Sequence, residues 1–151
     1  MTRPILFLDV DGVLGPLRQP GEDAGLDFRC VRRLEHVVSK TGCEIVLSSA
    51  WRHMGHGRHS VFGQCLRGVA CGWLLESVIG ATPLELSANE ERQDTILRYV
   101  ASCVMPERWV AIDDLESIER LPAGHWVRTD GSVGITDGNA ELAIDLLMGE
   151  P

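Results

Sequence analysis

The stretch from residue 5 to residue 14, which reads ILFLDVDGVL, limits both the fold and the chemistry of this chain. Its four leading apolar residues predict a strand that is buried on both faces, as the strands of parallel sheets are. Asp9 and Asp11 follow, and Gly12 then breaks the extended pattern. Two carboxylates beside a hydrophobic core repel each other and resist ionisation unless a cation or a hydrogen-bond donor compensates them. We therefore expect this strand to carry a functional site at its carboxyl end.

Two later strands are predicted to end in the same way. An apolar run at 44–47 stops at Ser48 and Ser49, and another at 109–112 stops at Asp113 and Asp114. In an open α/β sheet, ligands bind outside the carboxyl ends of the strands, near the point where the strand order reverses. Three such ends at one edge would bring four carboxylates and two hydroxyls into one crevice. An all-oxygen set of this kind suits Mg²⁺ better than a softer metal.

Helical periodicity separates the predicted strands. Ser87 and Glu90 have capping-box spacing and place the start of one helix near Asn89. Strands that alternate with helices imply an α/β fold, here a three-layer α/β/α sandwich with a central, mostly parallel sheet. No repeat or linker divides the chain, so we expect a single domain over residues 1–151 without a separate cap domain. The remaining predicted elements are helices at 27–42, at about 65–75 and after a cap at Asp137, and short strands at 77–81 and 126–128.

The composition argues against several classes of protein. A net charge of -8 disfavours binding of nucleic acid by bulk electrostatics, because such binding needs basic residues that displace counterions from phosphates. Recognition of a nucleic-acid end by a local site stays open. The five cysteines are an odd number without a CxxC pair, which predicts reduced thiols in a cytoplasmic protein. No apolar run approaches the roughly 20 residues that span a bilayer, so no membrane association is expected.

The three strand ends resemble the signatures of a known family. Residues 9–14 (DVDGVL) are similar to the first signature of the haloacid dehalogenase-like (HAD) superfamily, residues 47–49 (LSS) to its second, and residues 112–114 (IDD) to its fourth. The order and spacing agree, and the resemblance spans nearly the whole chain. Residues 49–52 (SAWR) resemble the small HAD domains grouped with RNA-repair proteins. The resemblance implies the Rossmann-like HAD fold and phosphate chemistry.

The resemblance also implies roles for the residues that match. Asp9 would be the nucleophile that attacks phosphorus and forms an aspartyl-phosphate. Asp11 would protonate the leaving oxygen and later activate water. Ser48, with Ser49 beside it, would hold the phosphoryl group. The implied ligands of Mg²⁺ are Asp9, Asp113, Asp114 and the backbone carbonyl of Asp11.

The third signature of the family is normally a lysine, and here the chain departs from the pattern. No lysine lies beyond Lys40, so an arginine must serve, and Arg92 is the candidate for phosphate binding. A planar guanidinium is able to bridge a carboxylate and a phosphate. The alternative is that Arg92 is a surface side chain neutralised by Glu90 and Glu91.

Other readings of the chain remain open at this stage. His53, His56 and His59 recur at every third residue, but the glycines around them favour a solvated or substrate-facing loop over a zinc site. Residues 15–25 are expected to form a flap. A capless, open site suits a large phosphorylated substrate, such as a nucleic-acid end or a nucleotide. Besides a phosphatase, the sequence is compatible with a phosphate- or nucleotide-binding module without turnover and with a phosphotransferase.

Overall fold

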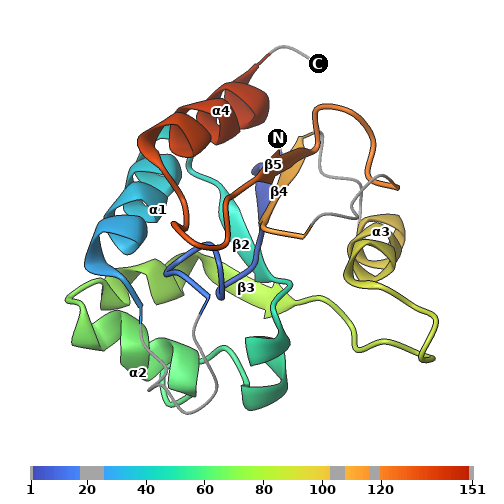
Figure 1. Cartoon of the computed structure of the whole chain (residues 1–151), viewed down its shortest axis with the longest axis horizontal. Helices are drawn as coiled ribbons and strands as arrows, with labels where there is room; N and C mark the ends of the chain where they lie inside the picture. Colours follow the sequence, from blue (N-terminus) through green and yellow to red (C-terminus); the bar gives the residue numbers. More distant parts are fainter. Residues whose placement is uncertain (1, 18–25, 103–107, 116–119, 150–151) are drawn as a thin grey trace.

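A five-stranded parallel sheet forms the centre of the computed structural model, which describes residues 2–17, 26–102, 108–115 and 120–149. The strands run in the order β3-β2-β1-β4-β5 (Figure 1). The α/β fold predicted from the sequence is confirmed, and the sheet is parallel throughout rather than mostly. The bounds of the strands are Ile5–Leu8 (β1), Glu44–Leu47 (β2), Val78–Ala81 (β3), Trp109–Asp113 (β4) and Trp126–Arg128 (β5).

Helices cover both faces of the sheet (Figure 1). Helices α1 (Phe28–Thr41), α2 (Val61–Gly68) and α4 (Asp137–Met148) contribute to one large core, together with Leu6 and Leu8 of β1. Helix α3 (Arg92–Ser102) packs on the other face, where Phe7 of β1 belongs to a smaller core. Two 3-10 helices, η1 (Ala50–Met54) and η2 (Gly72–Ser77), complete the connection from β2 to β3. None of the described helices is long and apolar enough to cross a membrane.

Several predicted element ends are confirmed and others are wrong. The helix predicted at 27–42 is α1, which begins one residue later because Asp27 is its cap and accepts a hydrogen bond from the Arg29 amide at 2.8 Å. Helix α4 is capped by Thr136, one residue before the predicted cap. The predicted helix at 65–75 is two elements, because α2 ends at Gly68 and Ala70 has a φ of 58°.

The helix predicted to start near Asn89 starts at Arg92. Ser87 and Glu90 form a turn instead of a capping box, with the Glu90 amide donating to the Ser87 carbonyl at 3.1 Å. Residues 18–25 of the predicted flap lie outside the described residues. Within the described ranges, the connections from β1 to β2 and from β2 to β3 form only a turn and the helices named above, and no separate cap domain.

The register of the sheet aligns the strand ends. Leu8 pairs with Leu47 of β2 and with Ile112 of β4. These three residues face the large core, so the residue that follows each of them faces the α3 side. The amide of Ser48 donates to the Leu8 carbonyl at 2.9 Å, and the amide of Asp9 donates to the Ile112 carbonyl at 3.1 Å. Ser48, Asp9 and Asp113 therefore lie in one row across three neighbouring strands.

Candidate active site

The loop after β1 separates its two aspartates. The amide of Leu14 donates to the Val10 carbonyl at 2.8 Å and so closes a single helical turn. This turn leaves Asp9 buried, at 2% exposure, whereas Asp11 is exposed to solvent. Trp51 Nε1 donates to Asp11 Oδ2 at 3.0 Å and fixes the carboxylate at the mouth of the site.

Three carboxylates converge beside this turn. One oxygen from each of Asp9, Asp113 and Asp114 lies within 4.8 Å of the others. Two glycines permit the approach of Asp114. A Cβ on Gly12, whose φ is +80°, would lie 2.3 Å from Asp114 Oδ2, and a Cβ on Gly131 would lie 2.6 Å from the same oxygen. The carboxylate cluster thus depends on the absence of a side chain at both positions.

Arg92 at the start of α3 contacts two of these carboxylates. Its Nη1 lies 3.2 Å from Asp9 Oδ2 and 2.9 Å from Asp113 Oδ2. Glu90, the suggested surface partner, pairs instead with Arg98, at 3.0 Å. The structure therefore places Arg92 in the site and not on the surface. The unfavourable position of a cation in the first turn of a helix is offset by these two carboxylates.

The charges in the cluster are only partly balanced. Burial of Asp9, together with the nearby Asp113 carboxylate, raises the pKa of Asp9 to about 8, although Arg92 opposes the shift. Burial also raises the pKa of Asp113, again against the effect of Arg92. Three ionised carboxylates and one guanidinium would leave two negative charges in the site. A divalent cation would neutralise them, and the oxygen donors suit a hard ion such as Mg²⁺.

The two predicted serines differ in what their hydroxyls do. Ser48 Oγ is buried and has no hydrogen-bond partner among the described residues. Ser49 Oγ accepts a hydrogen bond from the Trp51 amide at 3.1 Å and thereby caps η1. The unpaired hydroxyl of Ser48 is the one available to a ligand.

Sequence reasoning missed a fourth member of the row. Thr82 follows β3, and its amide donates to the Leu47 carbonyl at 2.9 Å, which extends the register of Ser48 by one more strand. Its hydroxyl is buried and also lacks a partner among the described residues. The signal was present, because Thr82 is the first residue after the strand predicted at 77–81, as Ser48 is after 44–47.

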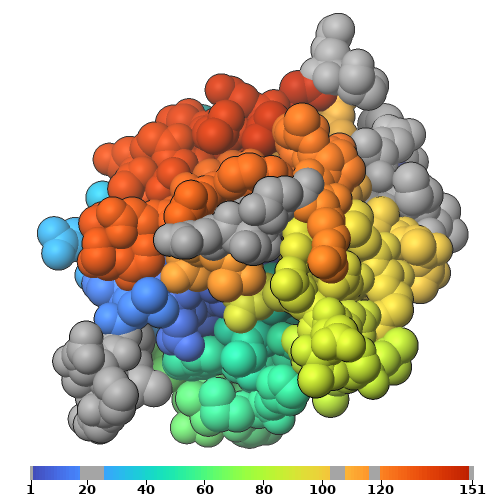
Figure 2. Space-filling model, turned by 45° about the vertical axis from the view of Figure 1, so that its right-hand side comes forward, coloured from blue at the N-terminus to red at the C-terminus, as the bar shows by residue number. Residues whose placement is uncertain are grey.

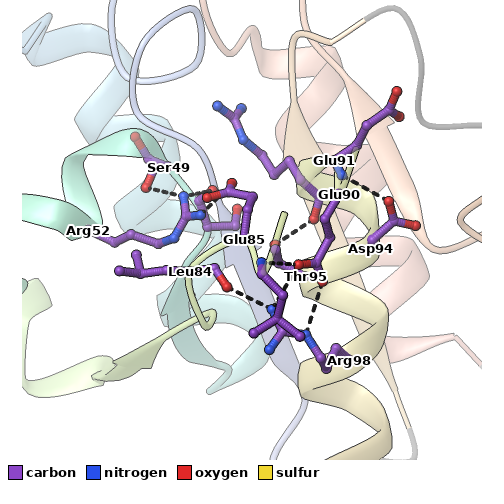
Figure 3. Close-up of polar contacts among 12 residues, drawn as sticks. Ser49, Arg52, Leu84, Glu85, Glu90, Glu91, Asp94, Thr95 and Arg98 are labelled. Carbon is purple, nitrogen blue, oxygen red and sulfur yellow. Dashed lines mark hydrogen bonds and ion pairs between the residues drawn. The ribbon is translucent and has the colours of Figure 1, made fainter. Parts of the chain in front are cut away.

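Arg52 is a second residue whose position was not foreseen. Its guanidinium lies between Ser49 and Glu85 in Figure 3, donating to the Ser49 carbonyl at 2.9 Å and to Glu85 Oε1 at 2.7 Å. It also donates to the Ser48 carbonyl at 3.3 Å. A buried cation therefore supports the backbone at the end of β2.

The histidine segment does not form a zinc site in the structure. His53 and His59 are exposed, and His56 is half-buried. Over the part of the chain that the structure describes, the only cluster of potential metal ligands is the acidic group Asp9, Asp113 and Asp114.

The site is open to solvent. The segments that follow β1 (blue), β2 (teal) and β3 (yellow-green) meet on one face of the molecule in Figure 2. A cleft of about 630 Å³ adjoins the carboxylate cluster through Asp114. Its other lining residues are Leu17, Arg128, Thr129, Asp130, Gly131 and Ser132. The cleft leaves room for the part of a substrate that lies beyond a bound phosphate.

Comparison with known proteins gives one family. Residues 5–140 match the family described as "HAD domain in Swiss Army Knife RNA repair proteins". No curated protein and no solved structure matches the chain significantly. The matched region contains all the strand ends described above, from Asp9 to Asp113.

Proposed function

Because the chain belongs to the family of HAD domains in Swiss Army Knife RNA repair proteins, we propose that it is a Mg²⁺-dependent phosphomonoester hydrolase that works through Asp9. The fold is of the phosphohydrolase type. The observation that carries the proposal is the position of Asp9. It is buried between Ser48 and Asp113 in one row, at the point where the strand order reverses, with Arg92 3.2 Å away.

The proposed reaction has two displacements at phosphorus. An oxygen of Asp9 attacks the phosphorus of the substrate, the bond to the leaving oxygen breaks, and Asp11 transfers its proton to that oxygen. Water then attacks the phosphorus of the aspartyl-phosphate while Asp11 removes a proton from the water, and the bond between phosphorus and the Asp9 oxygen breaks. Inorganic phosphate leaves, and both carboxylates return to their starting states.

Neighbouring side chains stabilise the charge on the phosphoryl group. The hydroxyl of Ser48 donates to one of its oxygens, which supplies the partner that this buried group lacks. The guanidinium of Arg92 compensates the negative charge of Asp9 and of the phosphate. Trp51 orients Asp11 towards the leaving oxygen through its 3.0 Å hydrogen bond.

The acidic cluster fits a divalent cation. Asp9, Asp113 and Asp114 would hold Mg²⁺, and their oxygen donors and the raised pKa of Asp9 support that assignment. The ion would supply charge neutralisation as an anionic substrate approaches an anionic nucleophile.

The substrate we propose is large and phosphorylated, such as a nucleic-acid end. The open site and the adjoining cleft support this, as does the description of the family. The net charge of -8 requires that any such recognition be local.

The test is phosphate release from an aryl phosphate in the presence of Mg²⁺. Release should disappear in Asp9→Asn and on addition of a chelator. Asp145→Asn on the exposed side of α4 is the matched control and should behave as wild type. Undiminished release by Asp9→Asn would exclude the mechanism. Binding of beryllium fluoride without any phosphate release would identify a binding module instead.

A further inference from the structure

Three buried side-chain polar atoms of the described residues lack a hydrogen-bond partner, namely Ser48 Oγ, Thr82 Oγ1 and Arg52 Nε. All three belong to the segments that follow β2 and β3. Buried polar groups in proteins are nearly always paired, so each unpaired one calls for an explanation, such as a functional role or a bound ion. Their concentration at one corner of the site indicates that a ligand group contacts this corner.

Thr82 is too far from Asp9 to contact the same phosphoryl group. Neighbouring strands lie about 4.8 Å apart, so Ser48 is one strand spacing from Asp9 and Thr82 is two, or roughly 10 Å. A phosphoryl group on Asp9 is within reach of the Ser48 hydroxyl but not of the Thr82 hydroxyl. A ligand group that pairs with Thr82 would therefore be a different part of the substrate.

The charge at this corner favours an anion. The side chain of Arg52 is only 2% exposed, and its ion-pair partner is Glu85 on the segment after Thr82. A guanidinium binds a carboxylate and a phosphate through the same planar set of donors. The carboxylate of Glu85 thus occupies the position that a phosphate of a ligand would take on Arg52.

The segment that carries Glu85 is held by few packed side chains. We call residues 83–91 the strap. Leu86 is 79% exposed, and most of the strap is exposed to solvent. Polar contacts hold it, since Arg52 binds Glu85 near one end, while Arg98 binds Glu90 and the Leu84 carbonyl (Figure 3). A segment held mainly by exchangeable polar contacts opens at low cost when another anion replaces one of them.

We propose that Thr82 and Arg52 form a second anion subsite, which Glu85 occupies in the free protein and which binds a second phosphate group of the substrate. The inference rests on the proposed function in one respect, because it assumes that the phosphate bound at Asp9 is the one that is hydrolysed. The chemical class is a phosphate monoester that carries a second phosphate close by. Both a phosphorylated nucleic-acid end, with its first phosphodiester, and a small bisphosphate belong to this class.

The experiment compares three ligands by calorimetry, with Mg²⁺, on the full chain in an Asp9→Asn background that prevents turnover. They are a nucleoside 5′-monophosphate, the 3′,5′-bisphosphate of the same nucleoside, and a 5′-phosphorylated dinucleotide. We expect at least one two-phosphate ligand to bind about tenfold or more tightly than the monophosphate. The small bisphosphate and the dinucleotide distinguish the two sources of the second phosphate.

Variants at the subsite then test the residues. The relevant quantity is the affinity for the two-phosphate ligand divided by the affinity for the monophosphate. Thr82→Val should reduce this ratio about tenfold, and Thr82→Ser, which keeps the hydroxyl, should preserve it. Glu85→Gln should increase the ratio, because a neutral amide competes less well for Arg52. This variant leaves Thr82 intact and decides the matter if Thr82→Val does not fold.

Several results would overturn the subsite. The first is equal affinity of the Asp9→Asn protein for all three ligands. The second is an equal loss of affinity for every ligand in Thr82→Val, and the third is a decreased affinity ratio in Glu85→Gln. The proposed function fails separately, if the wild-type chain releases no phosphate from any ester. In that case a ratio that depends on Thr82 would still establish the subsite.

Discussion

Asp9 should make the metal-free protein less stable as the pH rises. Its pKa is raised from an ordinary 3.8 to about 8, chiefly by burial and by Asp113. Between these two values the folded protein keeps a proton that the unfolded chain has released. The free energy of unfolding therefore falls as the pH rises through this window.

The size of the effect follows from a single proton. One proton of difference changes the free energy of unfolding by about 1.4 kcal/mol per pH unit. From pH 5 to pH 8 the loss attributable to Asp9 is therefore at most about 4 kcal/mol, a large fraction of the stability of a typical domain. Asn is a neutral isostere of the protonated carboxyl group. The free energy of unfolding of Asp9→Asn should equal that of the wild type near pH 5 and exceed it near pH 8.

The assay is urea unfolding of both proteins in chelator at several pH values, with the difference between them as the readout. That difference cancels the titration of shared groups that lie away from Asp9. Asp145→Asn should follow wild type throughout. Adding Mg²⁺ at pH 8, at a hundred times the dissociation constant of the ion, should raise the free energy of unfolding of the wild type by about 2.7 kcal/mol. The same addition should raise that of Asp9→Asn by less. Parallel stability curves for the two proteins in chelator would refute the reasoning.

Two further substitutions test the geometry around the nucleophile. Gly12→Ala should weaken Mg²⁺ binding at least tenfold in a calorimetric titration, because the new Cβ would displace the Asp114 carboxylate and the residue would be strained at a φ of +80°. Gly57→Ala, which meets nothing within 4 Å, is its control, and equal affinities in the two variants would contradict the expectation. Trp51→Phe keeps the buried ring but removes the N–H that binds Asp11, so the turnover rate on an aryl phosphate should fall about tenfold. Trp73→Phe, at a half-exposed indole away from the site, should leave the rate unchanged, and a comparable loss there would point to a general effect of ring size.

The strand ends were predictable because they depend on local pattern and on chain order. An apolar run of three or four residues followed by a polar side chain identified Asp9, Ser48 and Asp113, and parallel strands necessarily place such ends at one edge. The catalytic roles given to these residues remain predictions. Thr82 escaped notice because β3 is an edge strand that contains Gly80 and is only partly buried, so its apolar signal is weak.

Contacts between distant segments were beyond the reach of the sequence patterns. The hydrogen bond from Trp51 to Asp11 and the ion pair of Arg52 with Glu85 join residues with no periodic relation. The start of α3 was misplaced for the same reason. Glu90 has capping-box spacing, but the structure uses its carboxylate to bind Arg98.

The aligned row of Thr82, Ser48, Asp9 and Asp113 bears on quality control during folding. If β1, β2 or β4 slipped by a single residue against its neighbour, its terminal leucine or isoleucine would turn towards α3 and its polar end would enter the large core. The misaligned molecule would lose its core and its reaction centre together. Under the proposed function, phosphatase activity in a preparation would then measure the fraction of molecules whose strands are correctly paired.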